Sequence, residues 1–197
     1  MEDGNMSGNN AVILLEVMFF AGPNGSGKTT ITRMAKTVGD YINADDIKWT
    51  TLCSDLEAAV KAEELWEKMI EDKKDFTFET VLSTDCNLLL LQKARVQGYF
   101  VRGIYVLTAN PDINVVRVNA REAFGGHGVP QEKIRSRYAK ALSLIPQLVD
   151  VCDVLHIYDN TRIFKKRKNV YFRWSNQFWG KEDIERLSGI SEYINEK

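Results

Sequence analysis

The segment G-P-N-G-S-G-K-T at residues 22–29 matches the pattern G-x-x-x-x-G-K-[ST] at every fixed position, and few folds accommodate such a segment. A β-branched and aromatic stretch with strand character precedes it at residues 12–21, and a proline-free stretch that can form a helix follows at residues 29–36. A glycine-rich loop between a strand and the start of a helix presents backbone N–H groups and the positive end of the helix dipole to an anion. The segment is therefore predicted to hold the phosphates of a nucleoside triphosphate.

Each residue type in this loop has a predicted task. The three glycines allow positive φ and a close approach of the backbone to phosphate oxygens. Lys28 reaches the β- and γ-phosphates, and the hydroxyl of Thr29 can bind Mg²⁺. An ordinary glycine-rich turn is the alternative, which the strand and helix on either side disfavour. The predicted nucleotide-binding residues are Gly22, Pro23, Asn24, Gly25, Ser26, Gly27, Lys28, Thr29 and Thr30.

Composition and charge exclude several other classes of protein. With 197 residues, 44% of them hydrophobic and 27% charged, the chain suits one globular domain with a sizeable core. Its net charge of −1 gives no overall attraction to nucleic acid or to an anionic membrane, and its longest apolar run, at residues 11–21, is too short to span a bilayer. The acidic N-terminus lacks the basic region of a secretory signal, and three widely spaced cysteines indicate reduced thiols. We therefore expect a cytoplasmic protein with no membrane partner and no general affinity for nucleic acid.

The alternation of strand-like and helix-like segments from residue 12 onward predicts an α/β fold. We expect a three-layer α/β/α P-loop NTPase fold with a mostly parallel central sheet. Residues 1–10 are expected to be a disordered leader and residues 11–197 a single domain, in which residues 162–174 form a hairpin or edge strand and residues 184–194 a terminal helix. The other expected strands are residues 12–21, 41–45, 76–82, 99–107 and 154–158, and the expected helices include residues 56–70, 85–97, 112–124 and 129–152.

Acidic and hydroxyl side chains follow several of the predicted strands, where ligands of open α/β sheets bind. Phosphoryl transfer needs a carboxylate that holds the acceptor hydroxyl and takes its proton, and Asp45 is the predicted base. Asp46 is predicted to contact the acceptor. Capping the following helix is the alternative for both aspartates, and it is the stronger one for Asp46. Glu79 and Thr80 are also predicted to bind the acceptor, because a carboxylate among bulky strand residues is costly unless it faces a ligand or a cation; a structural salt bridge is the alternative for Glu79.

The charge that develops on a transferred phosphoryl group needs nearby cations. Arg117 and Arg121 are one helical turn apart and precede the loop G-G-H-G, which has the flexibility of a hinge. Arg121 is the predicted active-site cation and is also expected to contact the substrate. Arg135 and Arg137 follow the loop and are lid candidates. A solvated surface position is the alternative for each arginine, and Arg117 could pair with Glu122.

These motifs resemble the zeta toxin family of P-loop kinases. The resemblance rests on A-G-P-N-G-S-G-K-T-T (21–30), I-N-A-D-D-I (42–47), F-T-F-E-T-V-L-S (76–83) and Y-D-N-T (158–161). Its most specific part is V-R-V-N-A-R-E-A-F-G-G-H-G-V-P-Q-E-K-I-R-S-R-Y at residues 116–138. The order and spacing of the motifs agree over residues 17–161, whereas the expected hairpin and helix in residues 161–197 are atypical of the family.

The resemblance implies a kinase-like P-loop fold and a kinase that uses Mg²⁺ with ATP or GTP. It implies that Lys28 and the loop amides hold the triphosphate, that Asp45 is the catalytic base, that Glu79 binds the acceptor and that Arg121 contacts a phosphate. Toxin members of the family phosphorylate UDP-N-acetylglucosamine, so the implied acceptor is a small molecule such as a nucleotide sugar. An antitoxin partner would be a separate protein.

Two alternatives to a small-molecule kinase stay open at this point. A polynucleotide kinase would need a positive groove for its substrate, which the nearly neutral chain does not indicate. A nucleotide-dependent binding or switch module with negligible turnover would need no catalytic base, and the carboxylates at the strand ends disfavour it.

Overall fold

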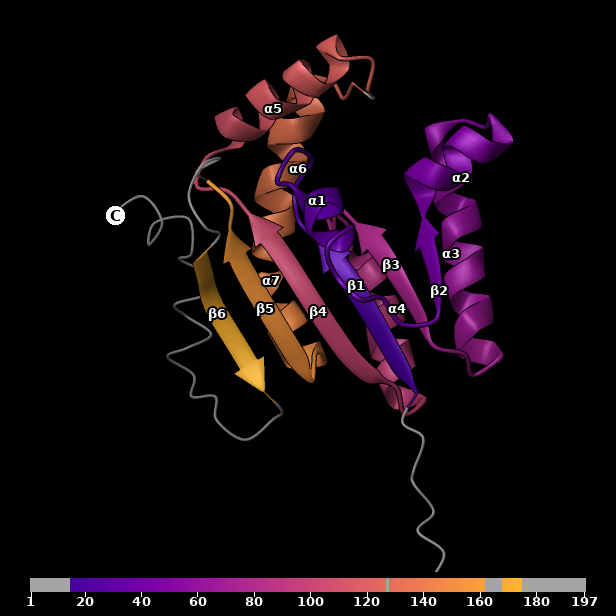
Figure 1. Cartoon of the computed structure of the whole chain (residues 1–197). Helices are drawn as coiled ribbons and strands as arrows, with labels where there is room; N and C mark the ends of the chain where they lie inside the picture. The colour runs from indigo at the N-terminus through magenta and orange to yellow at the C-terminus, as the bar shows by residue number, and fades with distance from the viewer. Residues whose placement is uncertain (1–14, 127, 162–167, 175–197) are drawn as a thin grey trace, which may run out of the picture.

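The computed structural model describes residues 15–126, 128–161 and 168–174, so the expected leader at residues 1–10 and the expected terminal helix at residues 184–194 lie outside the described residues. Strands and helices alternate along most of this part of the chain (Figure 1). In chain order the elements are β1 (Glu16–Ala21), α1 (Lys28–Thr32), β2 (Asp40–Asn43), α2 (Ala44–Thr51), α3 (Asp55–Glu71), β3 (Phe76–Thr80), α4 (Asp85–Val96), β4 (Phe100–Leu107), α5 (Pro111–Ala123), α6 (Gln131–Ser143), α7 (Ile145–Val151), β5 (Val154–Asp159) and β6 (Lys168–Trp174).

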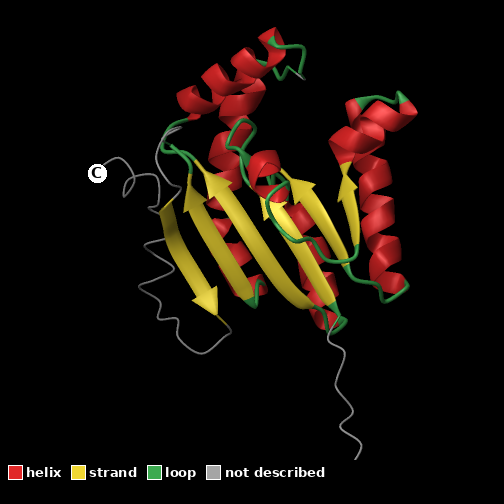
Figure 2. Cartoon of the chain, viewed as in Figure 1, coloured by secondary structure: helices red, strands yellow, loops and turns green. Residues whose placement is uncertain are grey.

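The described strands form one sheet in the order β2-β3-β1-β4-β5-β6 (Figure 2). The first five strands are parallel to their neighbours, and β6 pairs with β5 in the antiparallel direction. Strand β1 lies between β3 and β4, so that Phe20 is beside Glu79 on one side and Ile104 on the other. The predicted α/β fold with a mostly parallel sheet is confirmed, and β6 supplies an edge strand in the region where a hairpin or edge strand was expected.

The main hydrophobic core lies between the sheet and one layer of helices. Helices α3, α4 and α7 cover the face that points away from the viewer in Figure 1, and α1 lies on the other face. The strands fill this core with fully buried aromatic rings, among them Phe19 and Phe78. Trp66 of α3 packs on Phe78 with ring centroids 4.7 Å apart. Burial of each such ring contributes about 1.5–3 kcal/mol, so these contacts fix α3 firmly on the sheet. None of the described helices is both long and apolar enough to cross a membrane.

Local sequence signals set several helix boundaries. Helix α3 begins at a capping box in which Ser54 and Glu57 each bind the backbone N–H of the other. The single helix that we predicted for residues 129–152 is wrong, because the structure has two helices, α6 and α7, with a break at Leu144. Pro146 has no backbone N–H and cannot continue α6, so it opens a new helix in its first turn.

The carboxyl ends of the five parallel strands share one edge of the sheet, and this edge carries the segments that the sequence singled out. Residues 22–27 lead there from β1 to α1, and β2 ends at Asn43 directly before α2. Strand β4 leads to α5 at the same edge, where α1, α2 and α5 gather in Figure 1. The fold therefore brings residues that are far apart in sequence to one side of the molecule.

Candidate active site

The loop at residues 22–27 turns sharply between β1 and α1, and helix α5 packs directly against it. Gly25 has a φ of +78°, and a Cβ at this position would lie 2.6 Å from the backbone oxygen of Asn114 in α5. Gly27 has a φ of +101°, and the space for its missing Cβ is taken by the side-chain amide of Asn160. Glycine is required at both positions, because each combines positive φ with a close neighbour.

Two side-chain oxygens of this loop are buried without a hydrogen-bond partner among the described residues. They are Oδ1 of Asn24 and Oγ of Ser26. Buried polar atoms in folded proteins are nearly always paired, with protein groups or with a bound polar molecule. The hydroxyl of Ser26 can donate a hydrogen bond to a ligand, whereas Oδ1 of Asn24 can only accept one.

Lys28 lies inside the loop rather than on the surface, with 9% of its area exposed. Its Nζ donates to the backbone oxygen of Gly22 at 2.8 Å and to that of Pro23 at 3.2 Å. Burial lowers the pKa of Lys28, although the nearby carboxylates of Glu79 and Asp45 oppose this shift. The contacts hold the ammonium group at the loop, where the sequence predicts that a phosphate binds.

Glu79 of β3 accepts three hydrogen bonds, from residues of two other elements. Thr29 of α1 donates its hydroxyl to Oε1 of Glu79 at 2.8 Å. Thr32 of α1 and Tyr41 of β2 donate to Oε2, each at 3.1 Å. Among the described residues the hydrogen-bond partners of Glu79 are hydroxyl groups, so the structural salt bridge considered for it is not observed there.

Tyr41 and Asn43 belong to this cluster although sequence reasoning did not nominate them as site residues. Nδ2 of Asn43 donates to the hydroxyl of Tyr41 at 3.2 Å, and burial together with the charge of Glu79 raises the pKa of Tyr41. The two residues are two positions apart on β2, so they share one face of the sheet. Asn43 is paired with Glu79 of β3, which places that face beside the carboxylate. Strand alternation indicates that Tyr41 and Asn43 share a face. Their position beside Glu79 could be inferred only once β2 and β3 were known to be neighbours.

Asp45 and Asp46 occupy the first turn of α2, and Asn43 caps this helix. The side-chain oxygen of Asn43 accepts from the backbone N–H of Asp45 at 3.0 Å. The capping role considered for the two aspartates is therefore wrong, because an asparagine at the end of β2 already fills it. Burial and the charges of Asp45 and Glu79 raise the pKa of Asp46. Both aspartates are largely exposed, so the burial of the Asp46 carboxylate is only partial, and the charge of Asp45 acts on Lys28 of the loop.

Thr80 follows Glu79 but is engaged in the turn after β3. Its hydroxyl oxygen accepts from the backbone N–H of Leu82 at 3.0 Å and also binds Nδ2 of Asn87. Leu82 has a φ of +52°, and these bonds support that turn at the start of the β3–α4 connection. Contact between Thr80 and an acceptor stays a prediction.

The two arginines of α5 lie beside the loop. The charge of Arg121 acts on Lys28 and lowers its pKa, which puts Arg121 within electrostatic range of the predicted phosphate position. Arg117 donates from Nη2 to the backbone oxygen of Asn160 at 2.8 Å and to that of Thr161 at 3.3 Å. The solvated position considered for Arg117, paired with an acid, is not what these contacts show. Its guanidinium ties α5 to the end of β5.

The two lid candidates lie on α6. Arg135 forms an ion pair with Asp112 of α5, with Nη2 and Oδ1 2.5 Å apart, and both side chains are largely exposed. Arg137 is partly buried. Tyr138 secures α6 to the sheet edge, because its buried hydroxyl donates to the backbone oxygen of Thr108 at 2.6 Å. Movement of the arginines over a bound nucleotide remains a prediction.

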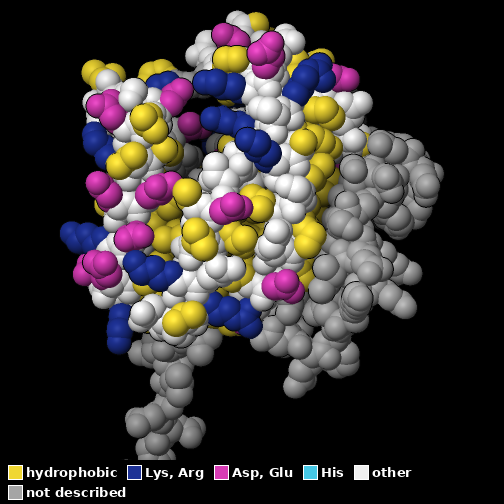
Figure 3. All heavy atoms as spheres, turned by 180° about the vertical axis from the view of Figure 1, so that it is seen from behind, with side chains coloured by type: hydrophobic (Ala, Val, Ile, Leu, Met, Phe, Trp, Pro, Cys, Tyr) yellow, Lys and Arg dark blue, Asp and Glu magenta, His cyan; other side chains and the backbone are white. Residues whose placement is uncertain are grey.

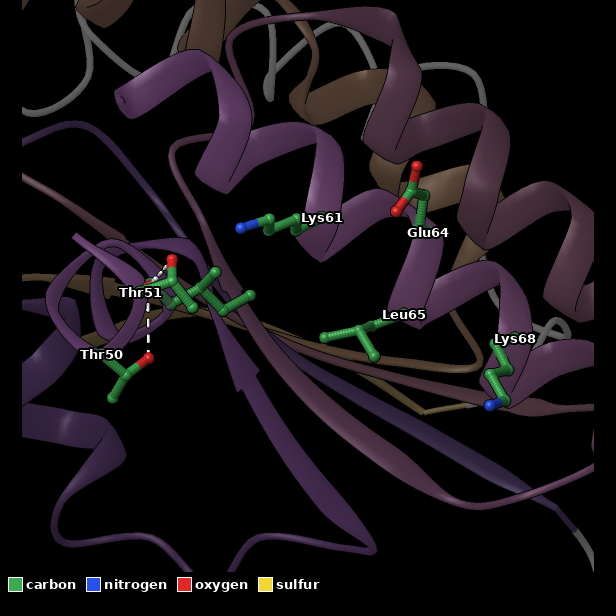
Figure 4. A pocket seen from close by; sticks show the side chains of 7 residues that line it. Thr50, Thr51, Lys61, Glu64, Leu65 and Lys68 are labelled. Atoms are coloured by element: carbon green, nitrogen blue, oxygen red, sulfur yellow. Dashed lines mark hydrogen bonds between the residues drawn. The ribbon is translucent and has the colours of Figure 1, made fainter. Parts of the chain in front are cut away.

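A groove between α2 and α3 lies apart from the phosphate loop. Its volume is about 430 Å³, and no residue of the loop lines it. Ile47 of α2 lines the groove, whereas Asp45, two positions earlier, lies on a different side of the same helix and does not line it. The lining residues are Ile47, Thr50, Thr51, Lys61, Glu64, Leu65 and Lys68 (Figure 4).

The surface is also hollowed at the edge of the sheet that carries the loop. Seen from behind, a hollow separates the column formed by α2 and α3 from the rest of the molecule, and Lys and Arg side chains gather beside it (Figure 3). Helix α2, whose first turn holds Asp45 and Asp46, belongs to this column. Positive charge beside the hollow suits an anionic ligand such as a phosphate group.

The chain is similar in sequence or in structure to several known proteins, although no protein-family model matches it. An uncharacterized protein of Haemophilus influenzae (strain ATCC 51907 / DSM 11121 / KW20 / Rd) is 28% identical over 129 residues, which cover 62% of this chain and 92% of that protein.

Three solved structures resemble the chain more broadly. A chain of the PezAT chromosomal toxin–antitoxin system of Streptococcus pneumoniae has a TM-score of 0.59 at 17% identity, covering 98% of this chain and 92% of its own. A chain of the AvrRxo1-ORF1:-ORF2 complex with ATP has a TM-score of 0.67 at 14% identity, covering 89% of this chain and 64% of its own. A chain of the Pnkp1/Rnl/Hen1 RNA repair complex has a TM-score of 0.50 at 17% identity, covering 68% and 46%. At such identities the likeness establishes the fold, which is that of the zeta-toxin-like P-loop kinases.

Proposed function

We propose that this protein is a kinase that transfers the γ-phosphate of ATP or GTP to a hydroxyl group of a small molecule. The observation that carries the proposal is the meeting of Lys28, the Thr29–Glu79 pair and the acidic first turn of α2 at one edge of the sheet. A phosphate grip, oxygen ligands for Mg²⁺ and a carboxylate base are the parts that phosphoryl transfer requires. A binding or switch module would have no use for the base, so the kinase is the better reading of the site.

Thr29 and Glu79 fit a Mg²⁺ ion that arrives with the nucleotide. Their side-chain oxygens are 2.8 Å apart, and hydroxyl and carboxylate oxygens are hard ligands of the kind Mg²⁺ prefers. When bound, the ion supplies positive charge to the β- and γ-phosphates. The contact supports a role for Glu79 beside the metal, in addition to its predicted contact with the acceptor.

The proposed reaction uses the side chains as follows. Lys28 and the backbone amides of residues 22–29 hold the triphosphate, and Asp45 accepts the proton of the acceptor hydroxyl as its oxygen attacks the γ-phosphorus. The bond from the γ-phosphorus to the bridging oxygen breaks, and the nucleoside diphosphate leaves with that electron pair. Arg121 balances the charge that develops on the phosphoryl oxygens, and Arg135 and Arg137 are proposed to close over them.

The acceptor is proposed to lie between the start of α2 and strand β3. Asp46, Glu79, Thr80 and Arg121 are its proposed contacts, and the hydroxyl of Tyr41 adds a polar group next to Glu79. The motifs that resemble the zeta toxin family favour UDP-N-acetylglucosamine as the acceptor. A cytoplasmic location and a separate antitoxin protein belong to the same proposal, and the PezAT toxin–antitoxin system, which shares the fold, supports the second of these.

Product analysis tests the proposal. The protein is incubated with Mg²⁺ and ATP or GTP, with and without UDP-N-acetylglucosamine, and the products are identified by mass spectrometry. A phosphorylated sugar nucleotide is the expected product. If other small molecules are phosphorylated and this one is not, the sugar assignment fails and the kinase stands. If no purine triphosphate binds to folded protein in the presence of Mg²⁺, the kinase proposal fails as well.

A polynucleotide kinase is the second candidate, because a chain of an RNA repair complex shares the fold. Its substrate would need a run of positive charge along the cleft. The measurement is transfer of labelled γ-phosphate to 5′-hydroxyl RNA and DNA at increasing salt. Labelled ends whose yield falls steeply with salt would favour this candidate over a small-molecule kinase.

A further inference from the structure

We propose that Asn160 is a positioning residue, which holds the phosphate loop in the shape that grips a nucleotide and joins it to α5 through Arg117. The proposal rests on the function proposed above, since it concerns the same loop. It assigns the segment after β5 a task in nucleotide binding that does not require contact with the nucleotide.

The side chain of Asn160 reaches the loop from the end of β5. Its Nδ2 donates to the backbone oxygen of Ser26 at 2.7 Å. The same nitrogen fills the space beside Gly27 that a Cβ would need. Because the C=O and N–H of a trans peptide point in opposite directions, a Ser26 carbonyl that faces Asn160 turns the N–H of Gly27 away from it. The contact thus sets the direction of one of the amides that the loop offers to a phosphate.

The backbone of Asn160 is itself fixed on two sides. Its N–H donates to the backbone oxygen of Leu107 at the end of β4, at 2.8 Å. Its carbonyl oxygen accepts from Nη2 of Arg117, also at 2.8 Å. The amide that holds the loop is therefore carried by the sheet and braced by α5, and a substitution of the side chain leaves both backbone contacts in place.

Helix α5 contacts the loop from the other side. A Cβ on Gly25 would lie 2.6 Å from the backbone oxygen of Asn114 and 3.1 Å from Cγ2 of Val118. The loop is therefore enclosed between α5 and Asn160, and Arg117 connects these two walls. A carbonyl of Ser26 released from Asn160 can turn toward the phosphates, where its partial negative charge repels them.

The test compares Asn160→Ala and Asn160→Asp with the wild type and with Gln92→Ala, which removes an exposed amide from α4. Hydrogen exchange is followed by mass spectrometry on the nucleotide-free protein, and ATP affinity by calorimetry. Both Asn160 variants are expected to raise exchange in residues 22–29 and to weaken ATP binding about fivefold to tenfold, the effect of one lost buried hydrogen bond. Gln92→Ala should match the wild type.

Kinetics separate positioning from general damage. The KM for ATP should rise by the same factor as the dissociation constant, while kcat changes less than about twofold. Exchange and affinity within twofold of wild type in both variants would overturn the proposal. Exchange that rises equally in β1, β4 and β5 would also overturn it, because it would show loss of the fold rather than of the loop. If the wild type takes up no ATP, the proposed function fails, whereas the exchange comparison still decides the role of Asn160.

Discussion

The hydroxyl of Thr29 donates to Oε1 of Glu79 across 2.8 Å and connects two residues that are 50 positions apart in sequence. The pairing arises because β3 lies directly beside β1, so the end of β3 is level with the start of α1. The other oxygen of the same carboxylate accepts from Thr32 and Tyr41. Glu79 therefore links the loop helix, β3 and the edge strand β2 at the point where a metal–nucleotide complex would sit.

We expect Glu79→Gln to raise the Mg²⁺ concentration needed for half-maximal activity by about tenfold or more, as removal of a carboxylate near a metal does. The amide keeps the size of the side chain but carries no negative charge. Activity is titrated with Mg²⁺ at saturating ATP, with the exposed Glu64→Gln on α3 as control. An unchanged Mg²⁺ dependence together with a higher KM for the acceptor would assign Glu79 to the acceptor alone.

We expect Asp45→Asn to lower kcat by about 10²–10⁴-fold, because the amide cannot take the proton of the acceptor hydroxyl. ATP binding, measured by calorimetry, should stay within twofold of the wild type. The neighbouring Asp46→Asn is the matched variant and should raise the KM of the acceptor more than it lowers kcat. An unchanged rate in Asp45→Asn would remove Asp45 from the mechanism.

The pKa of Lys28 is lowered, so we expect ATP affinity to decrease with rising pH. The decrease should begin at a lower pH than it would if Lys28 had the pKa of an exposed lysine. Burial of the ammonium group favours its neutral form, so rising pH removes the charge below the usual pKa of 10.5. The dissociation constant of ATP is measured from pH 7 to pH 10. Lys28→Arg stays charged over this range and should lack the alkaline loss. A flat wild-type profile would contradict the prediction.

The raised pKa of Asp46 predicts that Asp46→Asn is more thermostable than the wild type at neutral pH. Burial and the charges of Asp45 and Glu79 favour the protonated carboxyl in the folded state. The stability that this group contributes is thus fully present below its ordinary pKa of 3.8 and is lost as pH rises through the raised value. Melting temperatures from pH 3 to pH 8 should show a difference that vanishes at the acid end, with Asp150→Asn on α7 as control. A lower Tm for Asp46→Asn at neutral pH would refute this account.

Tyr138→Phe is expected to destabilise the protein by about 1 kcal/mol, because it leaves the buried carbonyl of Thr108 without its donor. For a chain of this size that corresponds to a fall in Tm of about 2–4 °C. Burial also raises the pKa of Tyr138 to about 12, so its hydroxyl stays a donor at any pH used for the measurement. Tyr158→Phe is the control, since the described residues offer its hydroxyl no hydrogen bond. Equal Tm values for the two variants would show that the Tyr138 bond contributes nothing.

Much of the fold could be predicted from the sequence because its signals are local. The strand before residues 22–29 and the alternation of elements after it indicated a parallel sheet, and capping residues such as Ser54 mark where helices begin. The prediction failed within residues 129–152, where apolar spacing continues across the break at Leu144. A proline can open a helix as well as end one, and only the packing of α7 on the sheet shows which occurs at Pro146.

Site residues that belong to a sequence motif could be predicted. Site residues whose role depends on contacts with a neighbouring element could not. Lys28 and Thr29 follow from the loop pattern alone. The contacts of Tyr41 with Glu79 and of Arg117 with Asn160 depend on which elements are neighbours in the fold. Periodicity in the sequence indicates only which residues share one face of a helix or strand. Asn43 took the capping role considered for Asp45 because two residue types that cap equally well stand two positions apart.

The bond from Asn160 to Ser26 spans 134 positions of the chain. A loop whose motif is eight residues long thus acquires its working geometry only after the fifth parallel strand has joined the sheet. Contacts of such range form late in folding, since closing a long segment is entropically costly. A nascent chain that ends before β5 would contain the complete motif and still bind triphosphate poorly. During refolding, nucleotide binding should therefore appear when β5 joins the sheet, and not when β1 forms.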